Sequence, residues 1–425
     1  MARIGRYEII HPIGDGSSSE VFLAFDPFFE RHVALKRFHP EHLRDTDVAR
    51  AQRQQLQMEA ALAGRLQHPH IVQIFDVTIG EDDAYLAMEY VPGGTLQNFC
   101  RPDNLLPIDR VVEILFKCSR ALEYAWRQGV THRDIKPANI LLTTDDATDV
   151  KVSDFGSALF QDYERTVVAG IGSPAYMSPE QVMEEPLNHQ TDIYSLGVVM
   201  YQLLTGRLPF MASNHVSLAH QISQGDALPP SAQRSDVPQT LDDIVMRAMH
   251  RSREVRYAGW QEFSHDLAQF ARTQKLTARH ALPSETQRFQ LMRAMPFFQR
   301  FDDVHIWEAL HLSSWREVSA GSLVMREGDA GSYFALLAAG RASICSHSLP
   351  LYRLSVGECF GEMSLFGAKH ARSADVIADS DCMLIEVRGQ ALDRASSECR
   401  MLFFHAFLDT LAHRLAAANE RIIHL

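Results

Sequence analysis

The segment His-Arg-Asp-Ile-Lys-Pro-Ala-Asn at positions 132–139, followed by Ser-Asp-Phe-Gly at positions 153–156, decides the fold of this chain. Asp134 could accept the proton of an attacking hydroxyl, and Asn139 and Asp154 could hold Mg²⁺ ions that bridge nucleotide phosphates. Phosphoryl transfer needs such a set, because its transition state is stabilised by positioning and charge neutralisation rather than by covalent help. The alternative is a hairpin with ordinary polar turn residues, and the sequence upstream argues against it.

A glycine-containing turn near the amino terminus could cradle phosphates. Ile13, Gly14 and Gly16 follow the alternating pattern of a strand at residues 7–10. Glycine lets backbone amides approach a phosphate closely, since a Cβ atom would block the approach. Two glycines alone would more often mark a hairpin turn, so the motif counts only together with the others.

A lysine and a glutamate follow in the order of an ATP site. Lys36 ends an apolar run that begins at residue 33, and Glu59 lies in a stretch with a helical pattern, residues 54–66. Such a pair is ordinarily a weak surface pair. Here, pairing with Glu59 would direct the Lys36 ammonium toward the α- and β-phosphates of ATP.

With these motifs in this order, residues 7 to about 270 resemble a eukaryotic-type serine/threonine protein kinase, of the kind also found in bacteria. The resemblance implies a bilobal kinase fold and transfer of the γ-phosphoryl group of ATP to protein hydroxyls, with Mg²⁺ or Mn²⁺ as cofactor. Asp134 is then the catalytic base, and Asn139 and Asp154 are the metal ligands. Lys136, which follows the base closely, is the choice of serine/threonine-specific members.

The same resemblance assigns an adenine site between the two lobes. The backbones of Glu89 and Val91 would pair with the adenine edge, as the hinge does in this family. The side chains of Val21, Ala34 and Leu141 would enclose the ring. The plainer interpretation of each of these apolar residues is a place in the hydrophobic core.

Residues 172–180 match the end of a kinase activation segment. The resemblance implies that Glu180 pairs with Arg256 as a structural bridge. It also implies that Asp192 braces the catalytic loop from a buried helix, predicted over residues 193–204.

Phosphorylation of the activation segment is a further expectation. Arg133, which precedes the base, could bind a phosphate on Thr166 and so order the segment. Tyr163 and Ser173 are weaker candidates, and Thr166 could equally be an unmodified loop residue.

Two positions depart from the family pattern. Ser19 stands in place of the third glycine of the phosphate loop, which stiffens the loop there. Ser178 replaces the alanine of the usual Ala-Pro-Glu, a change expected to matter little. Neither departure removes a group that performs chemistry, so the kinase is predicted to be active.

Composition agrees with a protein of more than one domain. The chain has 425 residues and a formal net charge of −12, which argues against nucleic acid as a partner, since phosphate backbones reward basic surfaces. The sequence contains no long apolar run, so a membrane anchor is not expected. The six cysteines show no paired spacing, which is typical of reduced thiols and indicates a cytoplasmic location.

The chain divides into a kinase domain at residues 1–270, a polar linker at residues 271–290 and a second module at residues 291–425. In the second module, glycines separate short β-rich runs, which predicts a small β-barrel or jelly roll with flanking helices. The whole chain is therefore predicted to be a multidomain α+β protein.

One segment of the second module has the features of an anion site. Gly361 precedes a short helical turn and would expose backbone amides to an anion. Arg372 returns from the next segment and could supply a bidentate fork for a phosphate. Glu362 could accept a hydrogen bond from a ribose hydroxyl.

On this pattern the second module resembles the cyclic nucleotide-binding domain, most closely that of bacterial catabolite activator protein. The resemblance implies that Glu362 binds the ribose 2′-hydroxyl and that Arg372 binds the cyclic phosphate, with Ser373 beside it. The backbone amides near Met363 and Ser364 would complete the site. Ser373 favours cAMP as the effector over cGMP, and a domain of this fold that has lost its ligand is the alternative.

A long helix is predicted over residues 399–425. An apolar seam suited to a partner helix, which favours a homodimer, is formed by Phe404, Leu408, Leu411, Leu415, Ala418 and Ile422. In the alternative, the helix folds back on its own barrel with Phe403 and Phe407 as packing residues. The two modules together predict a kinase that acts on protein substrates and is controlled by a cyclic nucleotide, or else a kinase whose second module serves only in dimerisation or docking.

Overall fold

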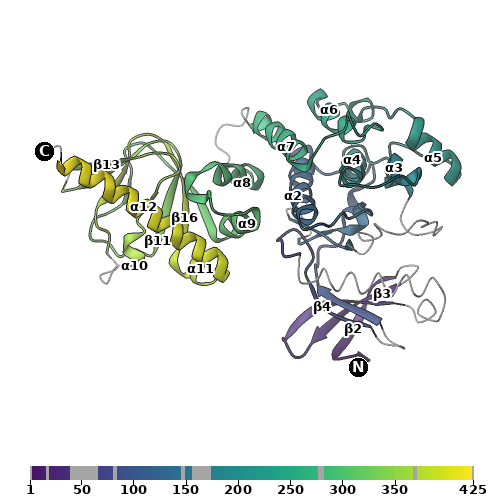
Figure 1. Ribbon diagram of the computed structural model, residues 1–425, viewed down its shortest axis with the longest axis horizontal. Helices are drawn as coiled ribbons and strands as arrows, with labels where there is room; N and C mark the ends of the chain where they lie inside the picture. The colour runs from purple at the N-terminus through teal and green to yellow at the C-terminus, as the bar shows by residue number, and fades with distance from the viewer. Residues whose placement is uncertain are drawn as a thin grey trace. The chain divides into compact units, whose positions relative to one another are not determined.

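The computed structural model describes the following residues: 2–15, 19–38, 66–79, 84–144, 149–155, 174–275, 282–347, 349–366 and 371–423. The chain forms two compact units, Met1–Thr273 and Gln274–Leu425. Both units combine helices with antiparallel sheets (Figure 1), so the predicted multidomain α+β class is confirmed.

The first unit begins with an antiparallel sheet of strand order β1-β2-β3-β4-β6-β5. Its strands are β1 (Arg3–Ile4), β2 (Tyr7–Asp15), β3 (Ser19–Asp26), β4 (Arg31–Phe38), β5 (Ile74–Ile79) and β6 (Ala84–Glu89). Along β4, Val33 and Leu35 belong to the hydrophobic cluster on one face of the sheet, and Ala34 belongs to the cluster on the other. This alternation fixes the register, which sets Lys36 opposite Val21 on β3 and Leu86 on β6.

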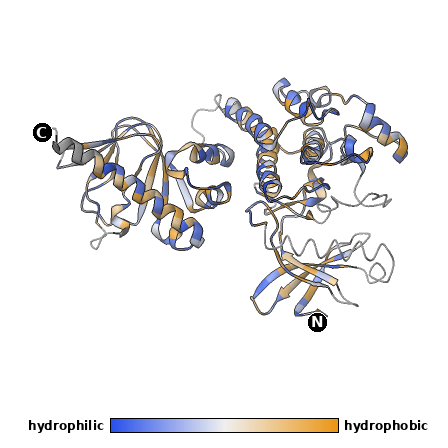
Figure 2. Cartoon of the chain, in the orientation of Figure 1, coloured by the Kyte–Doolittle hydropathy of each residue, from blue (hydrophilic) through white to orange (hydrophobic). Residues whose placement is uncertain are grey.

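The rest of the first unit is mainly helical. Its helices are α2 (Ile108–Arg127), α3 (Pro179–Val182), α4 (Gln190–Thr205), α5 (His215–Gln224), α6 (Gln239–Ala248) and α7 (Trp260–Lys275). Every residue of α4 is buried, and this helix contains the helix predicted over residues 193–204. In Figure 2 hydrophobic and hydrophilic residues alternate around α7, as expected for a helix that buries one face.

The hairpin of β7 (Ile140–Leu142) and β8 (Val150–Val152) follows α2 in the chain. Ile140 pairs with Val152 and Leu142 with Val150, and all four side chains are buried. Because the strands are antiparallel, the residue before β7 lies next to the residues after β8.

The second unit is built around two sheets of four strands, of order β10-β15-β12-β13 and β14-β11-β16-β9. Their strands are β9 (Ser313–Val318), β10 (Leu323–Met325), β11 (Tyr333–Ala339), β12 (Ala342–Ser346), β13 (Leu349–Leu354), β14 (Cys359–Phe360), β15 (Asp375–Ala378) and β16 (Cys382–Arg388). Residues from both sheets, among them Leu337, Leu384 and Val376, share one hydrophobic cluster. This is the small β-barrel or jelly roll that the sequence predicts.

Five helices accompany these sheets among the described residues: α8 (Glu285–Ala294), α9 (Asp303–Leu312), α10 (Met363–Phe366), α11 (Gly389–Asp393) and α12 (Ser397–Ile423). The start of α8 corrects the prediction that residues 271–290 form a linker. Ser284 caps α8 in a capping box with Gln287, so the helix begins inside that range. Helix α7 also extends to Lys275, past the expected end of the kinase domain at residue 270.

Helix α12 packs on the barrel through aromatic side chains. Phe403 and Phe407 are buried and contact Phe334 of β11 and Phe297. These two residues therefore pack within their own unit, as one of the two sequence interpretations holds. Of the seam predicted to bind a second copy, Leu408 is 63% exposed and Leu415 is 64% exposed, whereas Leu411 is half-buried.

Candidate functional site

The β7–β8 hairpin brings together the two expected metal ligands. Asn139 directly precedes β7, and Asp154 follows Ser153 directly after β8. The backbone N–H and the hydroxyl of Ser153 donate to the carbonyl oxygen of Asn139 at 2.8 and 3.1 Å. The register of this short hairpin therefore brings the backbone of Asn139 next to the residues that follow β8, which include Asp154.

The carboxylate of Asp134 lies against two of the other predicted site residues. Lys136 Nζ donates to Asp134 Oδ2 at 2.7 Å, and Asn139 Nδ2 donates to the same oxygen at 3.1 Å. Asn139 Nδ2 also donates to the backbone carbonyl of Asp134 at 2.8 Å. These contacts orient Oδ2 of the carboxylate, and within the described residues Oδ1 has no hydrogen-bond partner.

Asp192 of α4 holds the catalytic loop through its backbone. Its Oδ2 accepts from the N–H of His132 and its Oδ1 from the N–H of Arg133, both at 2.7 Å. The predicted brace is thus confirmed. Burial raises the pKa of Asp192, and the two N–H donors together with His132 oppose that rise.

Lys36 of β4 reaches across to Asp154. Its Nζ lies 2.7 Å from Asp154 Oδ1, so the ammonium of the amino-terminal sheet meets the carboxylate that follows β8. The charge of Lys36 holds the pKa of Asp154 below its ordinary value. Asp154 is therefore an anion at neutral pH, as a metal ligand has to be.

The residues expected around adenine lie in one place. Ala34, Val21, Val91 and Leu141 all belong to the hydrophobic cluster on one face of the amino-terminal sheet. Glu89 ends β6 and forms an ion pair with Lys151 at 3.0 Å. The structure thus brings these side chains together, which suits an adenine site and also the plainer interpretation as core.

The remaining residues expected at the ATP site divide into two groups. Ile13 and Gly14 lie on β2, where Gly14 pairs with Val21 and Ile13 is exposed. Gly16, Glu59 and the expected phosphosite Thr166 lie outside the described residues, so their roles stay predictions.

Arg133 has the features that a phosphate-binding arginine needs. Its Nε atom is buried and has no hydrogen-bond partner within the described parts of the chain. Burial lowers the pKa of its guanidinium, although arginine stays charged in proteins. Thr166 lies outside the described residues, so binding of a phosphate there by Arg133 stays a prediction.

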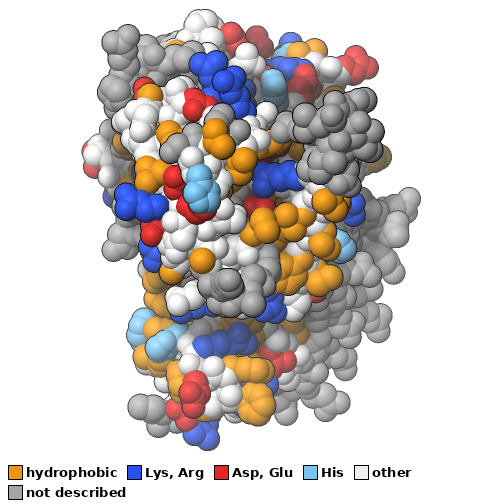
Figure 3. Space-filling view, turned by 90° about the vertical axis from the view of Figure 1, so that its left-hand side faces the viewer, with side chains coloured by type: hydrophobic (Ala, Val, Ile, Leu, Met, Phe, Trp, Pro, Cys, Tyr) orange, Lys and Arg blue, Asp and Glu red, His pale blue; other side chains and the backbone are white. Residues whose placement is uncertain are grey.

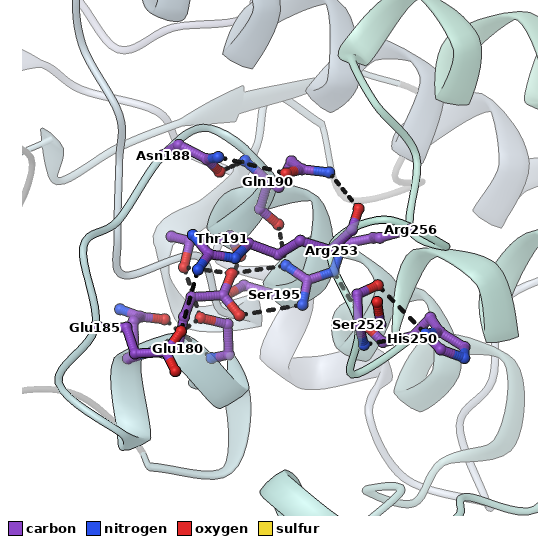
Figure 4. A network of polar contacts seen from close by, with 12 residues as sticks. Glu180, Glu185, Asn188, Gln190, Thr191, Ser195, His250, Ser252, Arg253 and Arg256 are labelled. Carbon is purple, nitrogen blue, oxygen red and sulfur yellow. Dashed lines mark hydrogen bonds and ion pairs between the residues drawn. The ribbon is translucent and has the colours of Figure 1, made fainter.

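A buried ion pair holds the end of the activation segment (Figure 4). Arg256 Nη1 and Nη2 donate to the two carboxylate oxygens of Glu180 at 2.7 and 3.1 Å, which confirms the predicted bridge. The side chain of Arg256 is 0% exposed and that of Glu180 is 2% exposed. Thr191 Oγ1 also donates to Glu180, at 3.2 Å.

Ser178 belongs to the same network, which corrects the expectation that its replacement of alanine matters little. Its side chain is fully buried and caps α3 by accepting from the N–H of Gln181. Its hydroxyl lies 2.5 Å from the hydroxyl of Thr191. Alanine could make neither bond.

The second candidate site centres on a buried arginine. Arg372 is 6% exposed, and its acceptors among the described residues are neutral: the carbonyl oxygens of Gly361 and Tyr333 at 2.8 and 2.7 Å, and Ser364 Oγ at 2.8 Å. Among the described residues no carboxylate forms an ion pair with it. Burial lowers the pKa of Arg372, as expected for a cation without a bound counter-charge.

Glycine is required at position 361. Its φ is +79°, in the left-handed region that side chains rarely adopt. A Cβ atom there would also lie 2.5 Å from Arg372 Nη1. The turn before α10 can therefore approach the guanidinium only because residue 361 has no side chain.

Glu362 is held from α12. Its Oε1 accepts from Arg414 Nη1 at 3.1 Å, and Arg414 Nη2 donates to the carbonyl of Cys359. The other oxygen, Oε2, is buried and has no hydrogen-bond partner among the described residues. Glu362 thus presents an unfilled acceptor near Arg372.

The other expected members of this site are more exposed. Met363 is 57% exposed, which leaves only its backbone as a candidate contact, and Ser373 is exposed. The structure therefore brings Gly361, Ser364 and Arg372 into direct contact, with Glu362 next to Gly361 in the chain.

Arg414 was not identified from the sequence as part of this site. The signal lies in the helical period: Phe403 and Phe407 are buried, and Arg414 follows Phe407 by two turns on the same face. Tyr333 was also missed, and its ring lies 4.7 Å from the Arg372 guanidinium.

None of the helices in the described parts of the chain has the length and hydrophobicity that a membrane span requires. Within the same described ranges, no cluster of three His, Cys, Asp or Glu side chains could hold a metal ion. On the face drawn in Figure 3, Lys and Arg side chains lie in separate places between hydrophobic and acidic ones.

Replacing Arg256 by leucine tests the buried bridge. The variant leaves Glu180 as a buried carboxylate without its cation, so the free energy of unfolding should fall by about 3–5 kcal/mol at neutral pH. In the wild type, burial would raise the pKa of Glu180, but Arg256 holds it below its ordinary value. The pair therefore contributes its full stabilisation at pH values above the ordinary pKa of glutamate. This contribution is lost as the pH falls through the lowered pKa of Glu180.

In the variant, burial alone raises the pKa of Glu180, so protonation relieves the buried charge and the difference from wild type should narrow in acid. Urea unfolding of both proteins at neutral and at mildly acidic pH measures this. Arg251→Leu is the matched control, because its ion pair with Asp226 is exposed and should contribute less than about 1 kcal/mol. Equal losses for the two variants would contradict the account.

Comparison with known proteins places both units in families. Residues 7–284 match the protein kinase domain, and residues 315–399 match the cyclic nucleotide-binding domain. A probable serine/threonine-protein kinase of Clostridium acetobutylicum is 35% identical over 266 residues, which are 62% of this chain and 39% of that protein.

Two mycobacterial relatives are similar to the same region. Serine/threonine-protein kinase PknB of Mycolicibacterium smegmatis is 36% identical over 299 residues, 68% of this chain and 47% of the relative. PknB of Mycobacterium tuberculosis is 37% identical over 270 residues, 62% of this chain and 42% of the relative. This chain thus spans less than half the length of the curated relatives it matches. It belongs to the protein kinase family, with serine/threonine-protein kinases as its relatives, and it carries a cyclic nucleotide-binding domain after the kinase domain.

Proposed function

We propose that this chain is an ATP-dependent serine/threonine protein kinase, which transfers the γ-phosphoryl group of ATP to hydroxyls of protein substrates. One observation carries the proposal: Asp134, Lys136 and Asn139 are in hydrogen-bond contact, and the β7–β8 register sets Asp154 beside Asn139. A base, a cation and two metal ligands are the groups that this reaction requires.

Each group has a distinct task in the proposed reaction. Asp134 accepts the proton of the substrate hydroxyl as its oxygen approaches the γ-phosphorus. Lys136, at 2.7 Å from Asp134, neutralises charge on the transferring group. Asp154 and Asn139 are the residues that would hold Mg²⁺ or Mn²⁺, which offsets the charge of the ATP phosphates when bound.

Lys36 and the apolar cluster position ATP. In the present arrangement Lys36 pairs with Asp154, and its ammonium is a charge-assisted donor for the α- and β-phosphates. Val21, Ala34 and Leu141 offer an apolar surface to the adenine ring. Ile13, Gly14 and Gly16 would cover the phosphates, and the backbones of Glu89 and Val91 would pair with adenine.

Replacing Asp134 by asparagine should lower the rate of phosphoryl transfer at least about a hundredfold, because the proton acceptor is lost while the shape is kept. The measurement is transfer of radiolabelled γ-phosphate to a serine- and threonine-containing protein. Asp243→Asn removes the same charge from an exposed position on α6 and should leave the rate unchanged. A parent protein without transfer, or an Asp134→Asn variant as fast as the parent, would refute the kinase proposal.

The cyclic nucleotide-binding domain is proposed to take up a cyclic nucleotide, with cAMP favoured, and to control the kinase. Arg372 is a buried cation that forms no ion pair with a carboxylate of the described residues, which suits a cyclic phosphate. The Oε2 atom of Glu362 has no hydrogen-bond partner in the described parts of the chain, which suits a ribose hydroxyl donor. Backbone amides near Met363 and Ser364, with Ser373, are the remaining expected contacts.

Binding at this site would act on α12 because Arg414 of that helix already pairs with Glu362. A ligand that strengthens or weakens this contact therefore changes how strongly α12 is held at the site. Coupling between two sites in one protein is typically about 1–3 kcal/mol, which corresponds to several-fold to a hundredfold changes in affinity.

A second role for this domain is dimerisation or docking without a ligand. Exposed apolar residues of the seam on α12 favour this role. The exposed fraction is 38% for Phe404, 63% for Leu408 and 64% for Leu415. Whether the domain binds a nucleotide distinguishes the two roles.

Fluorescent cAMP binding to the parent and to Arg372→Leu tests the sensing role. Loss of the guanidinium should weaken binding at least about tenfold, and the response of kinase turnover to cAMP should disappear with it. Arg341→Leu removes an exposed arginine from the same domain and should bind as the parent does. If the parent binds no cyclic nucleotide, the sensing role is wrong and the dimerisation role stands.

A further inference from the structure

The side chain of Gln181 connects the end of the activation segment to the catalytic loop. Its Oε1 accepts from the backbone N–H of Ser178 at 3.0 Å, and its Nε2 donates to the backbone carbonyl of Arg133 at 2.8 Å. One amide group thus bridges two segments that are more than forty residues apart in the sequence. The same residue closes the capping box of α3.

The carbonyl that Gln181 holds belongs to an unusual backbone position. Arg133 has a φ of +66°, in the left-handed region that non-glycine residues avoid. Such a conformation persists only where the surroundings determine it. Asp192 accepts from the N–H on one side of Arg133, and Gln181 donates to the carbonyl on the other side.

The peptide bond that Gln181 holds is the one that carries the proposed base. The carbonyl of Arg133 and the N–H of Asp134 belong to one planar group, so fixing the carbonyl fixes the direction in which Asp134 leaves the turn. The N–H of this group faces His132 Nδ1 at 3.3 Å, a long contact that holds it weakly. Within the described residues, the bond from Gln181 is therefore the stronger restraint on this peptide.

We propose that Gln181 is a positioning residue for Asp134, through which the end of the activation segment acts on the geometry of phosphoryl transfer. This inference rests on the proposed kinase function. It makes the catalytic loop sensitive to the placement of α3: if Ser178 and α3 shift, the donor to Arg133 shifts with them. The order of the activation segment and the direction of the base are thereby coupled.

Only an amide performs both tasks. Glutamate keeps an oxygen for the N–H of Ser178, but it sets a second oxygen against the carbonyl of Arg133, where the two acceptors repel. Gln181→Glu therefore separates the cap, which it keeps, from the restraint on Arg133, which it removes.

The decisive comparison is the full chain with Gln181→Glu and with Gln261→Glu. Gln261 is exposed on α7, so its substitution makes the same change of charge away from the catalytic loop. Gln181→Glu should lower kcat roughly ten- to hundredfold, because a small misplacement of the base is costly. Its KM for ATP should stay within about twofold of that of the parent. Its midpoint of thermal unfolding should stay close to that of the parent, because the cap of α3 persists. A kcat equal to that of the Gln261→Glu control would overturn the proposal, and so would a loss of kcat matched by unfolding.

Hydrogen exchange gives a readout that needs no catalysis. The backbone amide of Asp134 should exchange faster in Gln181→Glu than in Gln261→Glu, while the amides of α4 stay protected in both. Unchanged exchange at Asp134 would overturn the positioning role even if the enzyme were slow. A parent chain that transfers no phosphate would instead refute the kinase function, and the exchange result would still decide the role of Gln181.

Discussion

The carboxylate of Asp192 accepts hydrogen bonds from two consecutive backbone N–H groups of the catalytic loop, and the geometry of the active site depends on this contact. Asp192 lies on α4, whose residues are all buried, so the anchor is fixed by the core of the helical part. The loop that it holds contains Arg133 in a left-handed conformation. Without Asp192, the N–H groups of His132 and Arg133 would lose their acceptor, and the left-handed conformation would lose one of its restraints.

The two candidate sites differ in the charge of the side chains that form them. In the kinase domain, carboxylates gather where cations have to bind, and Lys36 holds the pKa of Asp154 low enough to keep it charged. In the cyclic nucleotide-binding domain, Arg372 is buried among neutral acceptors and lacks an ion-paired carboxylate among the described residues. A buried cation of this kind is costly unless an anion joins it. Within the described residues, the Arg372 site therefore lacks the negative charge that its proposed ligand supplies, whereas Asp154 and Asp134 of the kinase domain are already paired with Lys36 and Lys136.

The kinase chemistry could be predicted because its residues lie in short motifs with fixed spacing. The resemblance to the kinase family that those motifs carry implied the Glu180–Arg256 bridge and the Asp192 brace, and the structure has both. Arg414 and Gln181 act through contacts across long sequence separations, which no local pattern records. The spacing of Ser284 and Gln287 is that of a capping box and could have predicted the start of α8. The polar composition of residues 271–290 favoured a linker instead, and that interpretation was wrong at this end of the range. The apolar residues around adenine remain ambiguous, since core packing and ligand binding demand the same side chains.

The most direct test of the central claim is the rate of phosphoryl transfer by Asp192→Asn. Asparagine keeps the shape of the side chain but offers one acceptor where two are needed, so one N–H of the loop faces an amide donor. If the anchor determines the geometry, kcat should fall roughly ten- to hundredfold while the affinity for Mg·ATP stays within about twofold. A variant that transfers phosphate as fast as the parent would show that the catalytic loop holds its conformation without Asp192, and the account would be wrong.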